Sequence, residues 1–375
     1  MKIVYTIAGL YRPAGMERIL TDKANYLARK GHEVLIVTTE QEGRPDAFPL
    51  LAGVRRADLG IGYEKTNGKS FLDKALRYPF KKITHSQRLA ELLIREHPDV
   101  TVSLFCGDES FLPDIMDGSK KVLEVHFSRF KRLQYGRKGL WALADRWLSH
   151  RDERHIRRFD KFVTLTDEDL GYWGRPENGV CIPNFINVMP AVTASTEAPH
   201  VLAIGRFCHQ KAFDRLLRAW KQVKQDSASR GWTLRLAGGG EDADKLRALA
   251  AELNLTDSVE ILGARRDVES LYREASVYAL SSRYEGLPMV LLEAQSYGLP
   301  IVSFDCQCGP RDVVTDGKDG FLVPEGDIDG LAARLCELIR NPELRREMGL
   351  NARLAAARWD KEKIMQQWIR LFKSA

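Results

Sequence analysis

The sequence has few cysteines and no pattern that would pair them. There are six, and two of them, Cys306 and Cys308, stand close together. No second close pair completes the four ligands of a structural zinc site. Neither a disulfide framework nor such a zinc site is expected, and a reduced cytoplasm is the predicted setting.

Long hydrophobic runs and a leader are also missing. No stretch of 18 apolar residues occurs, so no membrane-spanning helix is predicted. The first residues, Met1–Ile7, become a strand-like run without a cleavage pattern, so no signal peptide is expected. The 375 residues, of which 44% are hydrophobic and 29% charged, suffice for two globular domains with a core each.

Signatures of several other function classes are absent. No Ser-His-Asp or Cys-His arrangement indicates nucleophilic catalysis, and no aspartate pair typical of a metal site stands out. No helix-turn-helix, zinc or RNP pattern indicates nucleic-acid binding. We therefore expect no metal, no cofactor and no nucleic-acid partner.

The net charge of +6 is unevenly distributed. Residues 1–187 contain 31 Lys+Arg and 25 Asp+Glu, whereas residues 188–375 contain 26 of each. We expect the basic half to meet a large anionic partner and the neutral half a small one. A nucleic-acid-binding protein stays open as an alternative on charge alone, and a DNA affinity that falls steeply with salt would reveal it.

Apolar runs and helical periodicities alternate along both halves of the chain. The run Lys2–Ile7 is followed by a loop, a helical pattern that stops at Gly31, and a second run, Val34–Val37. Residues 41–70, rich in glycine and charge, are expected to form a loop. After a linker-like segment at 187–200 the alternation resumes. We predict an α/β protein with two Rossmann-like β/α/β domains facing a cleft.

The segment after the apolar run Val277–Leu280 combines a carboxylate with a helix start. The run predicts a buried strand, and Pro288 suits the first position of a helix. Glu285 then lies beyond the carboxyl end of the strand, where ligands of open α/β sheets bind. The free N–H groups of Met289 and Val290 can face an anion such as a diphosphate.

A second carboxylate, Glu293, follows Glu285 with seven residues between them. Two solvated carboxylates are the plain interpretation. A glycosidase acid/base pair fits less well, because a rise of 1.5 Å per residue separates the two by on the order of 10 Å, against ~5–9.5 Å in such pairs. Two separate hydroxyl-binding roles fit better.

This spacing resembles the E(x7)E signature of the family 4 glycosyltransferases. The similarity continues through Ile301-Val302, the Gly-Pro-Arg-Asp of 309–312 and the Gly-Phe-Leu-Val of 320–323. The resemblance implies the GT-B fold and retention of anomeric configuration. It also implies that Glu285 contacts the donor sugar and Glu293 the nucleotide ribose.

Two cations follow the apolar run Val201–Ile204. Arg206 and Lys211 could be ordinary solvated loop residues, but a guanidinium fork and an ammonium group also suit a diphosphate. From Gly205 onward they match the family's G-R-x(4)-K pattern, which implies that they neutralise the leaving diphosphate. Ala212 stands where the family commonly has glycine.

Two further segments of the second half are candidates for nucleotide contacts. Gly238–Gly240 follow the predicted strand Thr233–Ala237, where either a tight turn or a close approach to a nucleotide would require glycine. Ile261–Arg265 resembles the family segment that holds the nucleobase, which implicates Arg265.

The first half offers three candidate residues. Gly15 and Met16 start a helix, and a plain strand-to-helix turn would explain them. In the resembled family this loop is usually Gly-Gly, with amides near the donor phosphates, and here Ala14 replaces the first glycine. His126 follows the apolar run Val122–Val125, where a structural hydrogen bond would explain it. The resemblance implies a contact with the donor sugar.

The resemblance therefore implies a retaining glycosyltransferase with its catalytic groups at His126, Arg206, Lys211 and Glu285. Residues 1–187 are expected to form the acceptor-side domain, and residues 188–359 the nucleotide-sugar domain. The helix at 360–375 is expected to pack back on the first domain.

The chain is similar to enzymes of bacterial capsule, exopolysaccharide or lipopolysaccharide synthesis. This implies transfer of a hexose or N-acetylhexosamine from a UDP-sugar to a saccharide acceptor, most simply a lipid-linked one. A GT-B sugar-nucleotide epimerase, which needs no acceptor, remains an alternative.

Two basic stretches of the first half suggest a surface for binding the membrane in which such an acceptor lies. Residues 129–158 carry a net charge of +7 and residues 65–95 one of +6. A solvated face is the plain interpretation. Both stretches also contain aromatic residues suited to a lipid headgroup boundary, namely Tyr78, Phe80, Trp141 and Trp147. We expect peripheral binding to the anionic inner face of the cytoplasmic membrane.

Overall fold

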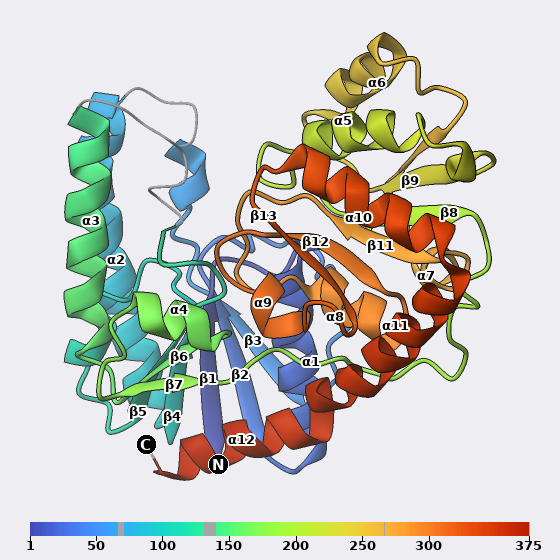
Figure 1. Ribbon diagram of the computed structural model, residues 1–375. Helices are drawn as coiled ribbons and strands as arrows, with labels where there is room; N and C mark the ends of the chain where they lie inside the picture. Colours follow the sequence, from blue (N-terminus) through green and yellow to red (C-terminus); the bar gives the residue numbers. More distant parts are fainter. Residues whose placement is uncertain (67–70, 131–139, 266, 375) are drawn as a thin grey trace. The chain divides into compact units, whose positions relative to one another are not determined.

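The computed structural model describes residues 1–66, 71–130, 140–265 and 267–374. The chain divides into two compact units. Unit 1 comprises Met1–Pro183 together with Ile364–Ala375, and unit 2 comprises Asn184–Lys363. Within the described ranges each unit contains a parallel sheet covered by helices, which confirms the prediction of two Rossmann-like α/β layers (Figure 1).

The sheet of unit 1 has the strand order β3-β2-β1-β4-β5-β6-β7, with every pairing parallel. Its strands are β1 (Lys2–Ile7), β2 (Glu33–Thr38), β3 (Val54–Asp58), β4 (Val100–Ser103), β5 (Lys120–Glu124), β6 (Lys161–Thr164) and β7 (Gly179–Cys181). The central strands are buried on both faces, as parallel sheets require, and this explains why they read as continuous apolar runs.

The helices of unit 1 connect these strands and cover the sheet. They are α1 (Gly15–Arg29), α2 (Phe71–Glu96), α3 (Leu140–Ile156), α4 (Asp167–Tyr172) and most of α12 (Lys361–Ser374), with the short helices η1 (Tyr63–Thr66) and η2 (Leu112–Asp114). α12 brings the end of the chain back to unit 1, where Trp368 and Phe372 are buried.

Unit 2 has the strand order β10-β9-β8-β11-β12-β13, again with every pairing parallel. Its strands are β8 (His200–Ile204), β9 (Thr233–Ala237), β10 (Val259–Gly263), β11 (Val277–Leu280), β12 (Ile301–Asp305) and β13 (Gly320–Pro324). The core of the unit lies between this sheet and helices such as α5, whose Trp220 is fully buried.

The helices of unit 2 follow its strands in the same alternation. They are α5 (Phe213–Val223), η4 (Ser227–Ser229), α6 (Ala243–Glu252), α7 (Glu269–Arg273), α8 (Met289–Ser296), α9 (Pro310–Val313), α10 (Ile328–Arg340), α11 (Pro342–Ala355) and η5 (Ala356–Trp359).

The strand order reverses once in each sheet, between β1 and β4 in unit 1 and between β8 and β11 in unit 2. Crevices at such reversals, outside the carboxyl ends of the strands, are where open α/β sheets bind ligands. The loop that follows β1 leads to Gly15 at the start of α1, and the loops that follow β8 and β11 carry Arg206 and Glu285. The fold therefore places these residues where ligands of this architecture bind.

Two expectations about the elements were wrong. Residues 41–70 include an edge strand, β3, which pairs with β2 through its backbone while most of its side chains are exposed. Without an apolar pattern there was no periodic signal to detect it. Pro288 precedes α8 instead of starting it, because its ψ of 95° is extended and the helix begins at Met289.

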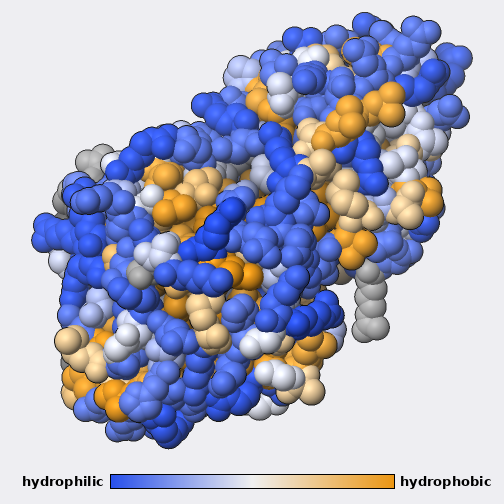
Figure 2. Space-filling view, turned by 90° about the horizontal axis from the view of Figure 1, so that it is seen from below, coloured by the Kyte–Doolittle hydropathy of each residue, from blue (hydrophilic) through white to orange (hydrophobic). Residues whose placement is uncertain are grey.

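α2 and α3 lie side by side (Figure 1), close enough for Lys82 and Arg151 to interact electrostatically. Among the described residues, no helix is long and apolar enough to cross a membrane. Figure 2 shows one face on which hydrophobic residues form separate groups among hydrophilic ones. Residues 131–139, which hold part of the basic stretch 129–158, lie outside the described residues, as does the side chain of Trp141.

Candidate functional site

In unit 2 the fold brings two of the predicted residues into direct contact. Lys211 Nζ lies 2.7 Å from Glu285 Oε1, although the two residues are 74 positions apart. Ser282 Oγ donates to the same carboxylate oxygen at 2.5 Å. The side chain of Glu285 is 6% exposed and that of Lys211 is 17% exposed. We call this contact the open pair, because the side chain of Lys211 remains partly exposed.

The open pair is held by contacts between the turn after β11 and the loop after β8. Arg283 N–H donates to the backbone carbonyl of Gln210, and Gln210 Nε2 donates to Tyr284 O at 3.0 Å. Ser281 Oγ donates to Lys211 O at 2.9 Å. These bonds fix the two segments to each other, so the geometry of the pair does not depend on two flexible side chains alone.

Ala212, which stands where the family pattern commonly has glycine, has a backbone conformation that favours glycine. It precedes α5 with φ 50° and ψ 42°, in the left-handed region. Glycine adopts this conformation without a Cβ penalty, whereas alanine is strained there. The loop that carries Lys211 therefore keeps the backbone path that a glycine would favour.

The other predicted residues of unit 2 lie on or after neighbouring elements of the same unit. Glu293, the fifth residue of α8, accepts a hydrogen bond from Tyr272 Oη at 2.8 Å. The first backbone bond of α8 is donated by Leu291 to Pro288 O, so the N–H groups of Met289 and Val290 precede the helical ladder. Arg206 and Arg265 are exposed and follow β8 and β10.

The glycine run after β9 is explained by backbone packing. Gly238 has φ +147°, and a Cβ placed on it would lie 1.9 Å from Gly205 O. Phe207 N–H donates to Gly239 O at 2.9 Å. The loops after β8 and β9 therefore pack backbone against backbone, which favours the turn interpretation of Gly238.

In unit 1, His126 is part of a buried charged network. Its Nε2 lies 2.7 Å from Glu124 Oε1, and the same oxygen accepts from Lys23 Nζ at 2.5 Å. Lys23 Nζ lies 3.6 Å from the centroid of the Trp368 ring. The side chains of Lys23 and Glu124 are each 1% exposed, and that of His126 is 7% exposed. We call the Lys23–Glu124 contact the sealed pair.

The ionisation of Glu124 decides which nitrogen of His126 carries a proton. Burial by itself opposes ionisation of Glu124, but the charges of Lys23 and His126 outweigh it and lower its pKa to about 2. Burial lowers the pKa of Lys23, against the attraction of Glu124. An ionised carboxylate only accepts hydrogen bonds, so Nε2 of His126 is the protonated donor. Nδ1 is then the ring nitrogen that remains for another group.

Gly15 and Met16 begin α1, after the extended Ala14. A Cβ on Gly15 would meet nothing within 4 Å, so this position is open. Glu17, one residue into the helix, is buried, and burial raises its carboxyl pKa. Its charge also interacts with His126, which places the helix start and the histidine in one electrostatic environment.

The comparisons with known proteins decide the family. A family model described as "Glycosyltransferase Family 4" matches residues 13–189, and one described as "Glycosyl transferases group 1" matches residues 186–355. Together they cover most of the chain.

The chain belongs to the family 4 glycosyltransferases.

An uncharacterized glycosyltransferase of Haemophilus influenzae is 28% identical over 372 residues, which are 98% of each chain. An amylovoran biosynthesis glycosyltransferase of Erwinia amylovora is 38% identical over 168 residues, covering 45% of this chain and 46% of that protein. The chain thus spans less than half of the Erwinia relative in this match.

The same fold occurs in a solved structure of Staphylococcus aureus TarM, a mutant in complex with Fondaparinux, alpha-GlcNAc-glycerol and UDP. The TM-score is 0.78 at 15% identity, and the match covers 99% of each chain. The fold of this glycosyltransferase is therefore GT-B, as the resemblance implied.

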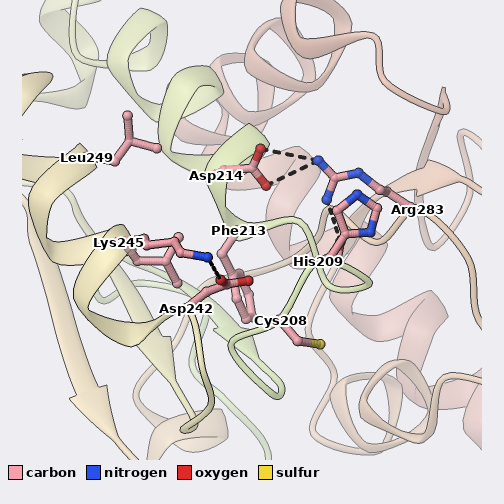
Figure 3. Close-up of a pocket in the computed structure, with 9 residues that line it drawn as sticks. Cys208, His209, Phe213, Asp214, Asp242, Lys245, Leu249 and Arg283 are labelled. Atoms are coloured by element: carbon pink, nitrogen blue, oxygen red, sulfur yellow. Dashed lines mark hydrogen bonds and ion pairs between the residues drawn. The ribbon is translucent and has the colours of Figure 1, made fainter. Parts of the chain in front are cut away.

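A pocket of about 310 Å³ opens in unit 2 of the glycosyltransferase, beside the loop that carries Lys211. Figure 3 shows Arg283 directed at Asp214, 3.3 Å away, and Lys245 at Asp242, 2.7 Å away. The pocket is lined by Cys208, His209, Phe213, Asp214, Asp242, Lys245, Leu246, Leu249 and Arg283. None of the predicted site residues is among them, so the pocket is a neighbour of the open pair and not part of it.

Sequence reasoning missed four residues that lie next to predicted site residues, or in one network with them, within the same unit. They are Lys23 and Glu124 in unit 1 and Tyr272 and Ser282 in unit 2. The only signal for Glu124 was a carboxylate within the otherwise apolar run Val122–Val125, two residues before His126. For Lys23 and Tyr272 the pattern held no signal, because helical charges and aromatics usually have ordinary structural roles.

Proposed function

We propose that this glycosyltransferase transfers a hexose or N-acetylhexosamine from a UDP-sugar to a lipid-linked saccharide, with retention of anomeric configuration, in bacterial surface polysaccharide synthesis. The open pair is the observation that carries the proposal. It combines a partly accessible cation with a carboxylate at the strand-order reversal of unit 2. The name of the Erwinia relative and the UDP in the TarM structure support the acceptor class and the donor.

In this proposal the cations act on the leaving group. Negative charge builds up on the diphosphate as the bond to the sugar breaks. Arg206, Lys211 and the free N–H groups of Met289 and Val290 supply preorganised positive charge for it. Two cations and a helix start suffice for this role, so we expect no metal ion to be required for transfer. Arg265 contacts the nucleotide.

The carboxylates act on hydroxyl groups. Glu285 is held by Lys211 and Ser282, and it binds a hydroxyl of the sugar. Glu293 binds the ribose, for which its contact with Tyr272 fixes the side chain. Gly15 and Met16 offer amides to the phosphates, and Nδ1 of His126 contacts the sugar. We assign no protein nucleophile; a phosphate oxygen of the donor takes the proton of the acceptor.

The acceptor places the enzyme at the inner face of the cytoplasmic membrane. α2 and α3 combine basic residues with exposed apolar side chains: Tyr78 is 45%, Phe80 71%, Ile83 56% and Trp147 63% exposed. Each Lys or Arg near an anionic leaflet contributes ~1 kcal/mol, so several support reversible attachment. Sedimentation with anionic and neutral vesicles tests this. Negligible binding to both at low salt would contradict it.

The donor assignment is tested by incubating the protein with a panel of nucleotide sugars while following thermal stability and slow donor hydrolysis. A UDP-sugar should raise the melting temperature and release UDP, and EDTA should leave turnover intact. Stabilisation by a different nucleotide alone would contradict the UDP assignment. Recovery of an isomerised donor without UDP would favour the epimerase. Activity lost in EDTA and restored by Mn²⁺, with the melting temperature unchanged, would contradict metal-free transfer.

A further inference from the structure

Unit 1 contains a second cluster of polar side chains that the proposed transfer reaction does not use. Glu109 lies in the segment after β4, and Asp152 and His155 lie three residues apart on α3, on one face of the helix. One ligand atom from each residue lies within 4.8 Å of the other two. The cluster therefore brings α3 into contact with the segment after β4.

Two members of the cluster each have one buried atom without a hydrogen-bond partner among the described residues. Glu109 is 5% exposed, and its Oε2 has no hydrogen-bond partner among the described residues. The same holds for Nδ1 of His155, which is likewise buried. Buried polar atoms are nearly always hydrogen-bonded, because a buried group without a partner loses its hydration without compensation. We therefore expect a ligand where a buried carboxylate oxygen and a buried imidazole nitrogen both have no hydrogen-bond partner.

The charges favour a cationic ligand. The carboxylates of Glu109 and Asp152 interact electrostatically with each other, and Asp108 adds a third carboxylate near Glu109. Carboxylate oxygens and a neutral imidazole nitrogen are groups that bind divalent metals. Lys82 interacts electrostatically with Glu109 but makes no ion pair with it in the described part of the chain.

We propose that Glu109, Asp152 and His155 bind a divalent transition-metal ion, Zn²⁺ or Mn²⁺, that ties α3 to the segment after β4. One imidazole nitrogen and two carboxylate oxygens suit these ions, with water completing the coordination. None of the three residues belongs to the machinery assigned to transfer. The ion is therefore a structural tie whose loss lowers the stability of unit 1, and the proposal does not rest on the proposed function.

Calorimetric titration of the full-length, chelator-stripped protein with ZnCl₂ and with MnCl₂ tests the site. We expect saturable binding of at least one of the two ions and a higher melting temperature at excess metal. Glu109→Gln and His155→Gln should each weaken binding by roughly tenfold or more, while circular dichroism shows a native fold. Absence of saturable binding by either ion, or unchanged binding in both folded variants, would overturn the proposal.

Two matched variants separate the metal from simpler explanations. Glu153 follows Asp152 but pairs with Arg129 and His150, outside the cluster. Glu153→Gln should therefore keep wild-type metal affinity. Lys82→Met removes the nearby competing cation and should strengthen metal binding. If Lys82→Met leaves metal binding unchanged and lowers the melting temperature of the metal-free protein, Lys82 is the counter-ion of Glu109 and the three residues are not the ligands of the metal.

Discussion

The two units can be compared through their lysine–glutamate pairs, which use the same chemistry in different surroundings. In the sealed pair of unit 1, Lys23 and Glu124 lie 2.5 Å apart, with each side chain 1% exposed. In the open pair of unit 2, Lys211 and Glu285 lie 2.7 Å apart, with side chains 17% and 6% exposed. The sealed pair has His126 and Trp368 as neighbours, whereas the open pair has the hydroxyl of Ser282.

The difference in exposure implies different roles: the sealed pair positions a neighbouring residue, and the open pair is available to bind a ligand. A lysine under a tryptophan ring cannot reach a ligand, so the sealed pair can only orient what it touches, and it touches His126. A partly accessible lysine can share its charge with an incoming diphosphate. The same residue pair therefore holds a ring in place in one unit and is available for a ligand in the other.

Breaking the sealed pair should have the largest effect on stability. Lys23→Met leaves Glu124 as a buried charge with only His126 beside it, which costs about 3–5 kcal/mol. Lys211→Met should cost less, because the side chain of Lys211 is partly exposed and Glu285 keeps the hydrogen bond from Ser282. Urea unfolding of both variants measures this. The double variant Lys23→Met/Glu124→Gln should recover part of the loss, and equal effects of the two single variants would remove the distinction.

Acid should weaken the sealed pair selectively. The pKa of Glu124 falls from an ordinary 4.5 to about 2 on folding. A carboxyl group with a lower pKa in the folded state stabilises the protein fully above its unfolded pKa and loses this contribution as the pH falls towards its folded pKa. The melting temperatures of the wild type and Glu124→Gln should therefore converge between about pH 5 and about pH 2. A constant difference over that range would show that Glu124 is not ionised.

Removing the cations near the open pair should affect turnover more than folding. Arg206→Ala and Lys211→Ala should each lower kcat by about 10²-fold, since they act on charge that develops only in the transition state. Arg218→Ala, an exposed cation on α5, is the matched control and should leave kcat unchanged. Wild-type kcat in both loop variants would make these residues ordinary surface charges.

The smallest effect is expected at Glu293. Glu293→Ala should weaken UDP binding by roughly 1–3 kcal/mol, because a ribose hydroxyl would lose its partner. Tyr272→Phe keeps the carboxylate and removes only its hydrogen bond, so its effect should be smaller. Calorimetry with UDP measures both. An unchanged dissociation constant in folded Glu293→Ala would contradict the ribose assignment.

Much of the fold could be predicted from the sequence because buried parallel strands are continuous apolar runs. Val277–Leu280 and Thr233–Ala237 appear in the structure with the bounds expected for them. β3 was missed because an edge strand held by backbone bonds needs no apolar side chains. Strand order, which creates the two reversal points, is a long-range property that no local pattern contains.

Only those residues of the candidate site that belong to a sequence motif could be predicted. The spacing of Glu285 and the loop position of Lys211 suggested ligand roles, but nothing in either segment indicated that the two side chains meet. Lys23 and Glu124 lie 101 positions apart, and each looks like an ordinary surface charge until the fold buries both. Contacts of this kind depend on tertiary packing, which a single sequence does not reveal.

The return of α12 to unit 1 has a consequence for biosynthesis. A ribosome releases Lys23 and Glu124 early, but Trp368 emerges only after the whole of unit 2 has been made. Until then the nascent first unit carries a lysine that lacks its covering ring. Unit 1 therefore reaches its final form after unit 2 has been translated, in the reverse of the usual order in which the N-terminal domain of a chain is completed first.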